Sequence, residues 1–182
     1  MKKILVPLAA GFEEIEAVTI IDLLRRAGAK VIVAGLVKRN VQGAHGLKLV
    51  ADTVLEEVLK ESWDMVVLPG GVPGAPNLMD DSRIIKLLKH QASANKTSAA
   101  ICAAPAVLEK AGLTARKKVT SHPTWANKMT TAIHTGARVQ VADLLVTGQA
   151  AGSSMEFAFK LIETLYGAEK VAEVNAGVLA RL

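Results

Sequence analysis

Cysteine and aromatic residues are scarce in this sequence of 182 residues. The single cysteine, Cys102, cannot form an intrachain disulfide or a zinc site built from several thiolates. One unpaired cysteine suits a reducing compartment, so we expect a cytoplasmic protein. The three Phe, two Trp and one Tyr supply too few stacking groups for a nucleic-acid surface.

Long apolar runs are also missing. No stretch approaches the roughly 18 apolar residues of a membrane span, so the sequence predicts no membrane partner. Residues 1–10 begin like a signal peptide, but their apolar run contains Pro7 and leads directly into Phe12, Glu13 and Glu14. We interpret this segment as a first strand. The net charge of +5 comes from Lys and Arg spread along the chain, which indicates solvated element ends and no nucleic-acid partner.

Motifs for bound cofactors are absent as well. The sequence has no G-x-G-x-x-G after a strand, no Walker sequence, and no cluster of His, Cys and Asp with the spacing of metal ligands. It therefore predicts neither a metal nor a cofactor. The length suits one domain over residues 1–182, large enough to bury a core without disulfides.

Short apolar runs alternate with segments of helical periodicity along the chain. This pattern predicts an α/β fold with a doubly wound, mostly parallel sheet and helices on both faces, flavodoxin-like and similar to class I glutamine amidotransferases. Residues 40–53 predict strands or a hairpin at the sheet edge, and residues 138–149 predict a second hairpin. Further strands are expected at residues 3–9, 30–36, 64–68, 97–101 and at 119, and helices at residues 13–27, 54–61, 82–94 (with Ser82 as N-cap), 105–111, 125–131, 153–166 and 168–180.

The first helix opens with an acidic cluster, Glu13-Glu14-Ile15-Glu16. Its apolar residues recur at near-helical spacing and are expected to form the buried face: Ile15, Val18, Ile21, Leu24 and Ala27. With Ile15 in the core, Glu14 and Glu16 point elsewhere, and one of them could face a site. Acidic residues in a first turn also serve as helix-dipole partners, so both roles stay open.

Cys102 follows the strand at residues 97–101 and precedes a helix with Pro105 in its first turn. This turn places the sulfur at the carboxyl edge of the sheet, where ligands bind in open α/β folds. It also places the sulfur at a helix amino terminus, which stabilises a thiolate. The arrangement resembles the nucleophile elbow of hydrolases. An inert core cysteine is the alternative.

Two other strand ends carry candidate residues. Gly70 and Gly71 follow a buried strand, and the N–H groups of Gly71 and Ala103 could form an oxyanion hole. A plain tight turn is the alternative. His122, in Ser-His-Pro, has the strand-end placement of an acid/base partner for a thiol, whereas a surface-turn histidine is the simpler interpretation.

Four motifs occur in a specific order: G-F-E-E-I-E-A-V, V-V-L-P-G-G, A-A-I-C-A-A-P and S-H-P, with a later G-S-S-M-E-F-A helix start. Together they cover nearly the whole chain. The sequence resembles the ThiJ/PfpI superfamily and, within it, the branch of the Parkinson disease-associated deglycase and its bacterial relatives.

The resemblance implies a flavodoxin-like homodimer with Cys102 as nucleophile. It places the family's glutamate on Glu16, the oxyanion-hole amides on Gly71 and Ala103, and the nearby histidine on His122. Two departures concern the site and the dimer contacts: Ala150-Ala151 stands where relatives commonly have Gly-Pro, and relatives place an arginine near His45.

Two functions follow from this resemblance. The first is a cysteine-dependent, glutathione-independent glyoxalase or deglycase that acts on methylglyoxal, glyoxal or their early adducts through a hemithioacetal on Cys102. The second is an oxidative-stress sensor or holdase chaperone that works through oxidation of Cys102. Protease activity belongs to a more distant branch and is less expected.

Overall fold

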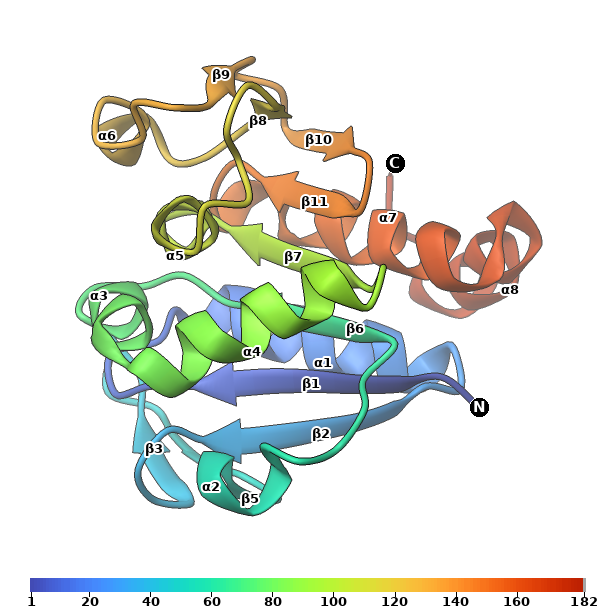
Figure 1. The fold of residues 1–182 in the computed structure, drawn as a ribbon. Coiled ribbons are helices and arrows are strands. Elements are labelled where there is room, and N and C mark those ends of the chain that lie inside the picture. Colours follow the sequence, from blue (N-terminus) through green and yellow to red (C-terminus); the bar gives the residue numbers. More distant parts are fainter. Residues whose placement is uncertain (182) are drawn as a thin grey trace.

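The computed structural model describes residues 1–181. At its centre lies a seven-stranded sheet in the order β10-β11-β7-β6-β1-β2-β5 (Figure 1). Every neighbouring pair is parallel except β10 with β11. The strands of this sheet are β1 (Lys3–Leu8), β2 (Lys30–Gly35), β5 (Thr53–Val54), β6 (Met65–Leu68), β7 (Thr97–Ile101), β10 (Val139–Ala142) and β11 (Leu145–Gly148). The prediction of a doubly wound, mostly parallel sheet is confirmed.

Helices cover both faces of the sheet (Figure 1). One face packs against α1 (Glu14–Arg26), α7 (Ser154–Tyr166) and α8 (Ala168–Val178). The other face packs against α2 (Leu55–Val58), α4 (Ser82–Ser93) and α5 (Pro105–Lys110). Along β1, Ile4 and Val6 belong to the first hydrophobic cluster and Leu5 to the second. A strand buried on both faces explains why the sequence shows continuous apolar runs instead of alternation.

The chain changes faces between β1 and β6, which are neighbours in the sheet. From β1 it continues into α1 on one face, and from β6 it continues through α3 (Gly74–Asp80) into α4 on the other. Such a switch point opens a crevice at the carboxyl ends of the strands, the usual ligand site of this architecture. Helix α3 is not among the predicted helices, because its seven residues include Pro76 and show no apolar periodicity.

The predicted buried face of α1 is wrong at its first turns. Ile15 and Val18 are 58% and 51% exposed, whereas Glu14 and Glu16 are buried. Polar groups can be buried when hydrogen bonds replace water. Backbone N–H groups of other segments supply those bonds to both carboxyl groups. The predictions for Ile21, Leu24 and Ala27 are confirmed.

Several smaller predictions also need correction. Residues 40–53 do contain a hairpin, but β3 (Asn40–Gln42) and β4 (Lys48–Val50) form a separate two-stranded sheet, and β5 supplies the edge strand. The hairpin at residues 138–149 is confirmed as β10 and β11. Since β11 occupies the place beside β7, β8 (Lys118–Val119) pairs with β9 (Ile133–His134) outside the main sheet.

Two helix starts also differ from the prediction. The cap of α4 is Asp81, whose carboxyl accepts a hydrogen bond from the N–H of Arg83, so Ser82 is already helical. The short helix expected at residues 125–131 is α6 (Pro123–Ala126), capped by His122. Proline suits the first helical position because it has no N–H to leave unpaired.

Candidate active site

Cys102 lies on a tight turn between β7 and α5 and is partly exposed. Its φ of +64° is unusual for a residue with a side chain. Hydrogen bonds hold this conformation on both sides: the N–H of Cys102 donates to Gly148 O at 3.0 Å, and its carbonyl accepts from the N–H of His122 at 2.9 Å. A strained residue fixed by its surroundings is characteristic of functional sites. The geometry matches the predicted elbow.

Two backbone N–H groups, those of Ala103 and Gly71, donate hydrogen bonds to the Cys102 sulfur. Gly71 has a φ of +94°, and a Cβ at this position would lie 2.3 Å from Glu13 N and 2.4 Å from Gly11 O. Only glycine therefore fits there. The structure brings both predicted amides to the thiol, in an arrangement that can stabilise negative charge.

Glu16 reaches the same point from the first turn of α1, and its side chain has no solvent exposure. Its Oε2 accepts a hydrogen bond of 2.7 Å from the N–H of Gly70, and its carboxyl group is a hydrogen-bond partner of Cys102. Within residues 1–181, Oε1 has no N–H or O–H donor. A carboxylate oxygen buried without a donor is costly, whereas a protonated oxygen could donate to sulfur.

The ionisation of Glu16 and Cys102 is coupled. Burial raises the pKa of Glu16 to about 7. Burial and the charge of Glu16 raise the pKa of Cys102 to about 12, although the N–H groups of Ala103 and Gly71 act in the opposite direction. Groups in such contact titrate as a pair, so the site loses one proton near neutral pH and keeps the other. Two N–H donors on sulfur and the unpaired Oε1 favour the state with a thiolate and a protonated Glu16.

His122 lies beside this pair through its backbone. Its N–H bonds to the Cys102 carbonyl, while the ring Nδ1 pairs with Thr124 Oγ1 at 2.8 Å and accepts from the Thr124 N–H at 3.3 Å. The imidazole therefore caps α6 locally. Among residues 1–181, no carboxylate lies in a salt bridge with this ring, so no cysteine–histidine–acid triad is formed.

Glu14 has a structural role that the sequence did not predict. Its Oε1 accepts hydrogen bonds from the N–H groups of His45 (2.7 Å) and Leu47 (3.3 Å), and its Oε2 pairs with His45 Nδ1 at 3.0 Å. Glu13, Glu14 and His45 bring potential ligand atoms within 4.8 Å of one another. The hydrogen bonds of Glu14 explain why these side chains lie together, because they anchor the loop before β4 to α1. Of the two departures from the family pattern, His45 contacts Glu14. The other, Ala150-Ala151, lies where a 3-10 turn (Ala151–Ser153) begins.

A cavity of about 900 Å³ is lined by none of the five predicted site residues. Cys102 lies instead at a partly exposed turn next to a buried carboxyl group.

The fold and the site together define a class of α/β proteins that have a cysteine on a strand-to-helix elbow, beside a buried glutamate and two inward amides. Residues 2–164 match the sequence pattern of the DJ-1/PfpI family, and the chain belongs to this family. No helix within residues 1–181 has the length and apolarity to cross a membrane.

Named relatives support this assignment. Protein DJ-1 homolog B of Arabidopsis thaliana is 44% identical to this protein over 97% of its chain. The matched part is only 41% of the length of the Arabidopsis protein. Glutathione-independent glyoxalase DJR-1.2 of Caenorhabditis elegans is 38% identical over 87% of this chain and 85% of its own. The structure of oxidized Toxoplasma gondii DJ-1 superimposes with a TM-score of 0.96 at 38% identity and covers all of both chains.

Proposed function

We propose that this protein is a cysteine-dependent, glutathione-independent glyoxalase that also acts as a deglycase on early adducts of methylglyoxal or glyoxal. The observation that carries the proposal is the contact between Cys102 and Glu16 beneath the N–H groups of Gly71 and Ala103. It combines a nucleophile, a group that transfers protons and donors for a developing oxyanion. The relative named as a glyoxalase adds support.

The first step is addition to methylglyoxal. The Cys102 thiolate attacks the aldehyde carbon, and the N–H groups of Gly71 and Ala103 stabilise the oxyanion. Glu16 then gives its proton to that oxygen, which yields a hemithioacetal and leaves a carboxylate. A carboxyl group whose pKa has been raised to about 7 can both donate and accept a proton near neutral pH.

The second step moves hydrogen between two carbons. Glu16 removes the proton from the former aldehyde carbon, giving an enediolate, and returns it to the neighbouring carbon. The hydroxyl proton on the first carbon passes to the oxygen of the second, giving a lactate thioester. Water then hydrolyses the thioester and releases lactate and the free thiol. One carbon is oxidised and its neighbour is reduced, so the reaction balances without a redox cofactor. In a glycated amine or thiol, the Cys102 thiolate attacks the adduct carbon, the bond from this carbon to the amine or thiol breaks, and the amine or thiol leaves with a proton from Glu16. The same hemithioacetal results.

Lactate formation by metal-free protein without glutathione tests this proposal. We expect turnover by the wild type and none by Cys102→Ser. Glu16→Gln should form the hemithioacetal but release no lactate, because the amide cannot transfer the carbon-bound proton. As a matched control, Ser93→Ala alters a small exposed side chain on α4 and should leave turnover unchanged. One modification per chain with no further lactate would contradict the enzymatic proposal.

The second candidate function is an oxidative-stress sensor or holdase chaperone. The partial exposure of Cys102 and the two N–H groups directed at its sulfur favour it, since sulfenic and sulfinic oxygens accept hydrogen bonds. In this case peroxide would oxidise Cys102 and change the protein's capacity to hold unfolded clients, whether or not aldehydes turn over. We place either function in the cytoplasm, where a free thiol persists.

We also propose a homodimer built on α1. The exposed side chain of Val18 and that of Met155, from α7, line a groove of about 360 Å³ that continues to Val178 on α8. Ile15 lies exposed one turn earlier on α1. Apolar side chains gathered on adjacent helices are typical of an interface between copies.

A further inference from the structure

A large cavity lies away from the cysteine, at the carboxyl ends of β1 and β2. Its volume is about 900 Å³, within the range of cavities that hold small-molecule ligands. Its floor consists of Leu8 and Ala9 at the end of β1, Leu36 after β2, and Val41 on β3, all buried. The exposed side chains of Val37 and Val50 extend this apolar lining outward.

The apolar part of the lining is aliphatic, and no aromatic side chain is among the lining residues. Stacking therefore cannot select a ring-containing ligand there, whereas burial of methylene groups favours an aliphatic one. The polar part consists of three amides, Asn40, Gln42 and Asn77, and of three charged residues, Lys38, Lys48 and Asp80. The position fits a ligand site, because ligands of open α/β sheets bind outside the carboxyl ends of the strands.

Two lysines are among the residues that line this cavity. Lys38 follows β2 and Lys48 belongs to β4, and both line the cavity. Neither forms a salt bridge with any residue in the described part of the chain. Their charges are therefore available to an anionic ligand.

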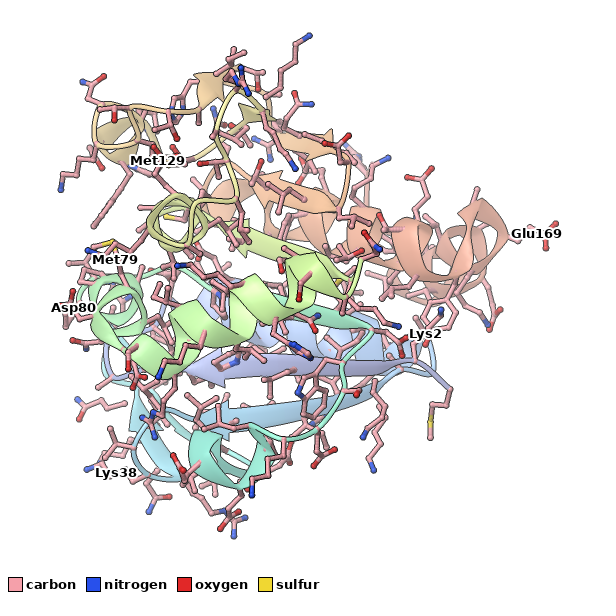
Figure 2. The ribbon with its side chains drawn as sticks, viewed as in Figure 1. Lys2, Lys38, Met79, Asp80, Met129 and Glu169 are labelled. Atoms are coloured by element: carbon pink, nitrogen blue, oxygen red, sulfur yellow. The ribbon has the colours of Figure 1, made fainter. Side chains whose placement is uncertain are left out.

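A third charged residue limits the ligand to one anionic group. Asp80, at the end of α3, lines the cavity on a different wall from Lys38. Figure 2 shows the two side chains apart from each other at the edge toward which β1 and β2 run. A carboxylate near the lysines is attracted, whereas a second carboxylate at the far end of the ligand would meet a like charge.

We propose that this cavity binds an unbranched aliphatic monocarboxylate, with its carboxylate between Lys38 and Lys48 and its hydrocarbon chain over Leu8, Leu36 and Val41. The site uses none of the residues assigned to the Cys102 chemistry, so it is independent of the proposed enzymatic function. Both activities can be tested on one preparation, and each can fail without the other.

Calorimetric titration with hexanoate, octanoate and decanoate tests the proposal. We expect one saturable site per chain, with affinity rising about fourfold for each added methylene group. Cys102→Ser protein should bind equally well. Decanedioate should bind more weakly than decanoate because its second carboxylate approaches Asp80. Absence of saturable binding, or affinity independent of chain length, would overturn the proposal.

Charge variants identify the position of the carboxylate. The double variant Lys38→Gln/Lys48→Gln should bind octanoate about tenfold more weakly but bind octanol as the wild type does. The matched control, Lys86→Gln/Lys89→Gln, removes two exposed lysines on α4 and should change neither affinity. Equal loss in both double variants would mean that only net charge matters, and would overturn the placement.

A substitution in the apolar lining tests whether another copy of the chain occupies the cavity instead. Val37→Asp should weaken octanoate and octanol alike without changing the sedimentation coefficient. The matched control is Val141→Asp, which changes an exposed valine on β10 that does not line the cavity. Dissociation of an assembly by Val37→Asp alone would show that a second copy covers the cavity, and would refute the proposed ligand.

Discussion

Glu16 and Cys102 meet across Gly70. A Cβ added to Gly70 would lie 2.7 Å from Glu16 Oε2 and 2.8 Å from the Cβ of Cys102. The space left by a missing side chain therefore lets the carboxyl group from α1 approach the thiol after β7. The N–H of the same glycine holds Oε2 in place.

Gly70→Ala should disrupt this contact without changing any ionisable group. The new methyl group would displace Glu16, Cys102 or both, and a shift of about 1 Å can cost roughly a hundredfold in turnover. Lactate production measures the loss. Gly152→Ala is the matched control, because a Cβ there meets no atom within 4 Å. Equal turnover of the two variants would show that the close approach at Gly70 is unimportant.

Glu16→Leu should raise the pH midpoint for alkylation of Cys102 by iodoacetamide by roughly one unit or more. It removes the O–H donor that we assign to the thiolate and leaves the sulfur equally buried. Glu16→Gln keeps a donor and should lie closer to the wild type. A lower midpoint in Glu16→Leu would instead mean that Glu16 is charged and repels the thiolate.

Glu16 should also make folding stability depend on pH. Its pKa rises from 4.5 to about 7 on folding, so the folded state binds the proton more tightly. The stabilisation is complete below pH 4.5 and is lost as the pH rises through 7, with a total of about 3 kcal/mol. Urea unfolding of the wild type between pH 4.5 and 7.5 should show this fall.

The matching Glu16→Gln protein should lose most of this pH dependence of the unfolding free energy, because position 16 then has no carboxyl group that titrates in either state. Histidine titration contributes to the curves of both proteins and cancels in their difference. Parallel curves for the wild type and the variant would show that Glu16 has an ordinary pKa in the folded protein.

His122→Ala should slow turnover by less than the roughly hundredfold typical of a lost general acid or base, and should leave alkylation of Cys102 unchanged. The imidazole Nδ1 is engaged by Thr124, and no carboxylate within residues 1–181 forms a salt bridge with the ring. Thr124→Val removes the same local contact and serves as its comparison. Complete loss of alkylation in His122→Ala would identify the histidine as an activating base.

Val18→Asp should convert the proposed dimer into monomers at micromolar concentration. The variant places a charge beside Met155 and Val178, the apolar side chains that line the same groove. Sedimentation velocity measures the change, with Val141→Asp as a matched exposed valine on another element. A wild-type protein that sediments as a monomer would contradict the dimer itself.

The sequence determined the sheet and the elbow because both depend on local patterns. Apolar runs of four to six residues, separated by amphipathic segments, encode strands such as β1 (Lys3–Leu8) and β6 (Met65–Leu68) that are buried on both faces. The Cys102 turn could be predicted for the same reason, since a short apolar strand directly precedes a helix with proline in its first turn.

The orientation of α1 was decided only by the tertiary structure. Helical spacing placed Ile15 in the core, yet Ile15 is exposed and Glu16 is fully buried. Periodicity ranks faces by apolarity and takes no account of hydrogen-bond donors that distant segments bring. Here the N–H groups of Gly70 and His45 donate hydrogen bonds to the two buried carboxyl groups, which offsets part of the cost of burying that face.

The protonation of the site likewise depends on tertiary structure. The sequence could propose Glu16 as a partner of Cys102 through a family resemblance, but the raised pKa of Glu16 comes from its burial beneath other elements.

The position of β8 outside the main sheet was also decided by the tertiary structure, because β11, later in the chain, takes the place beside β7. Local sequence specifies which elements form, whereas competition between distant segments for the same neighbours decides which groups are buried together.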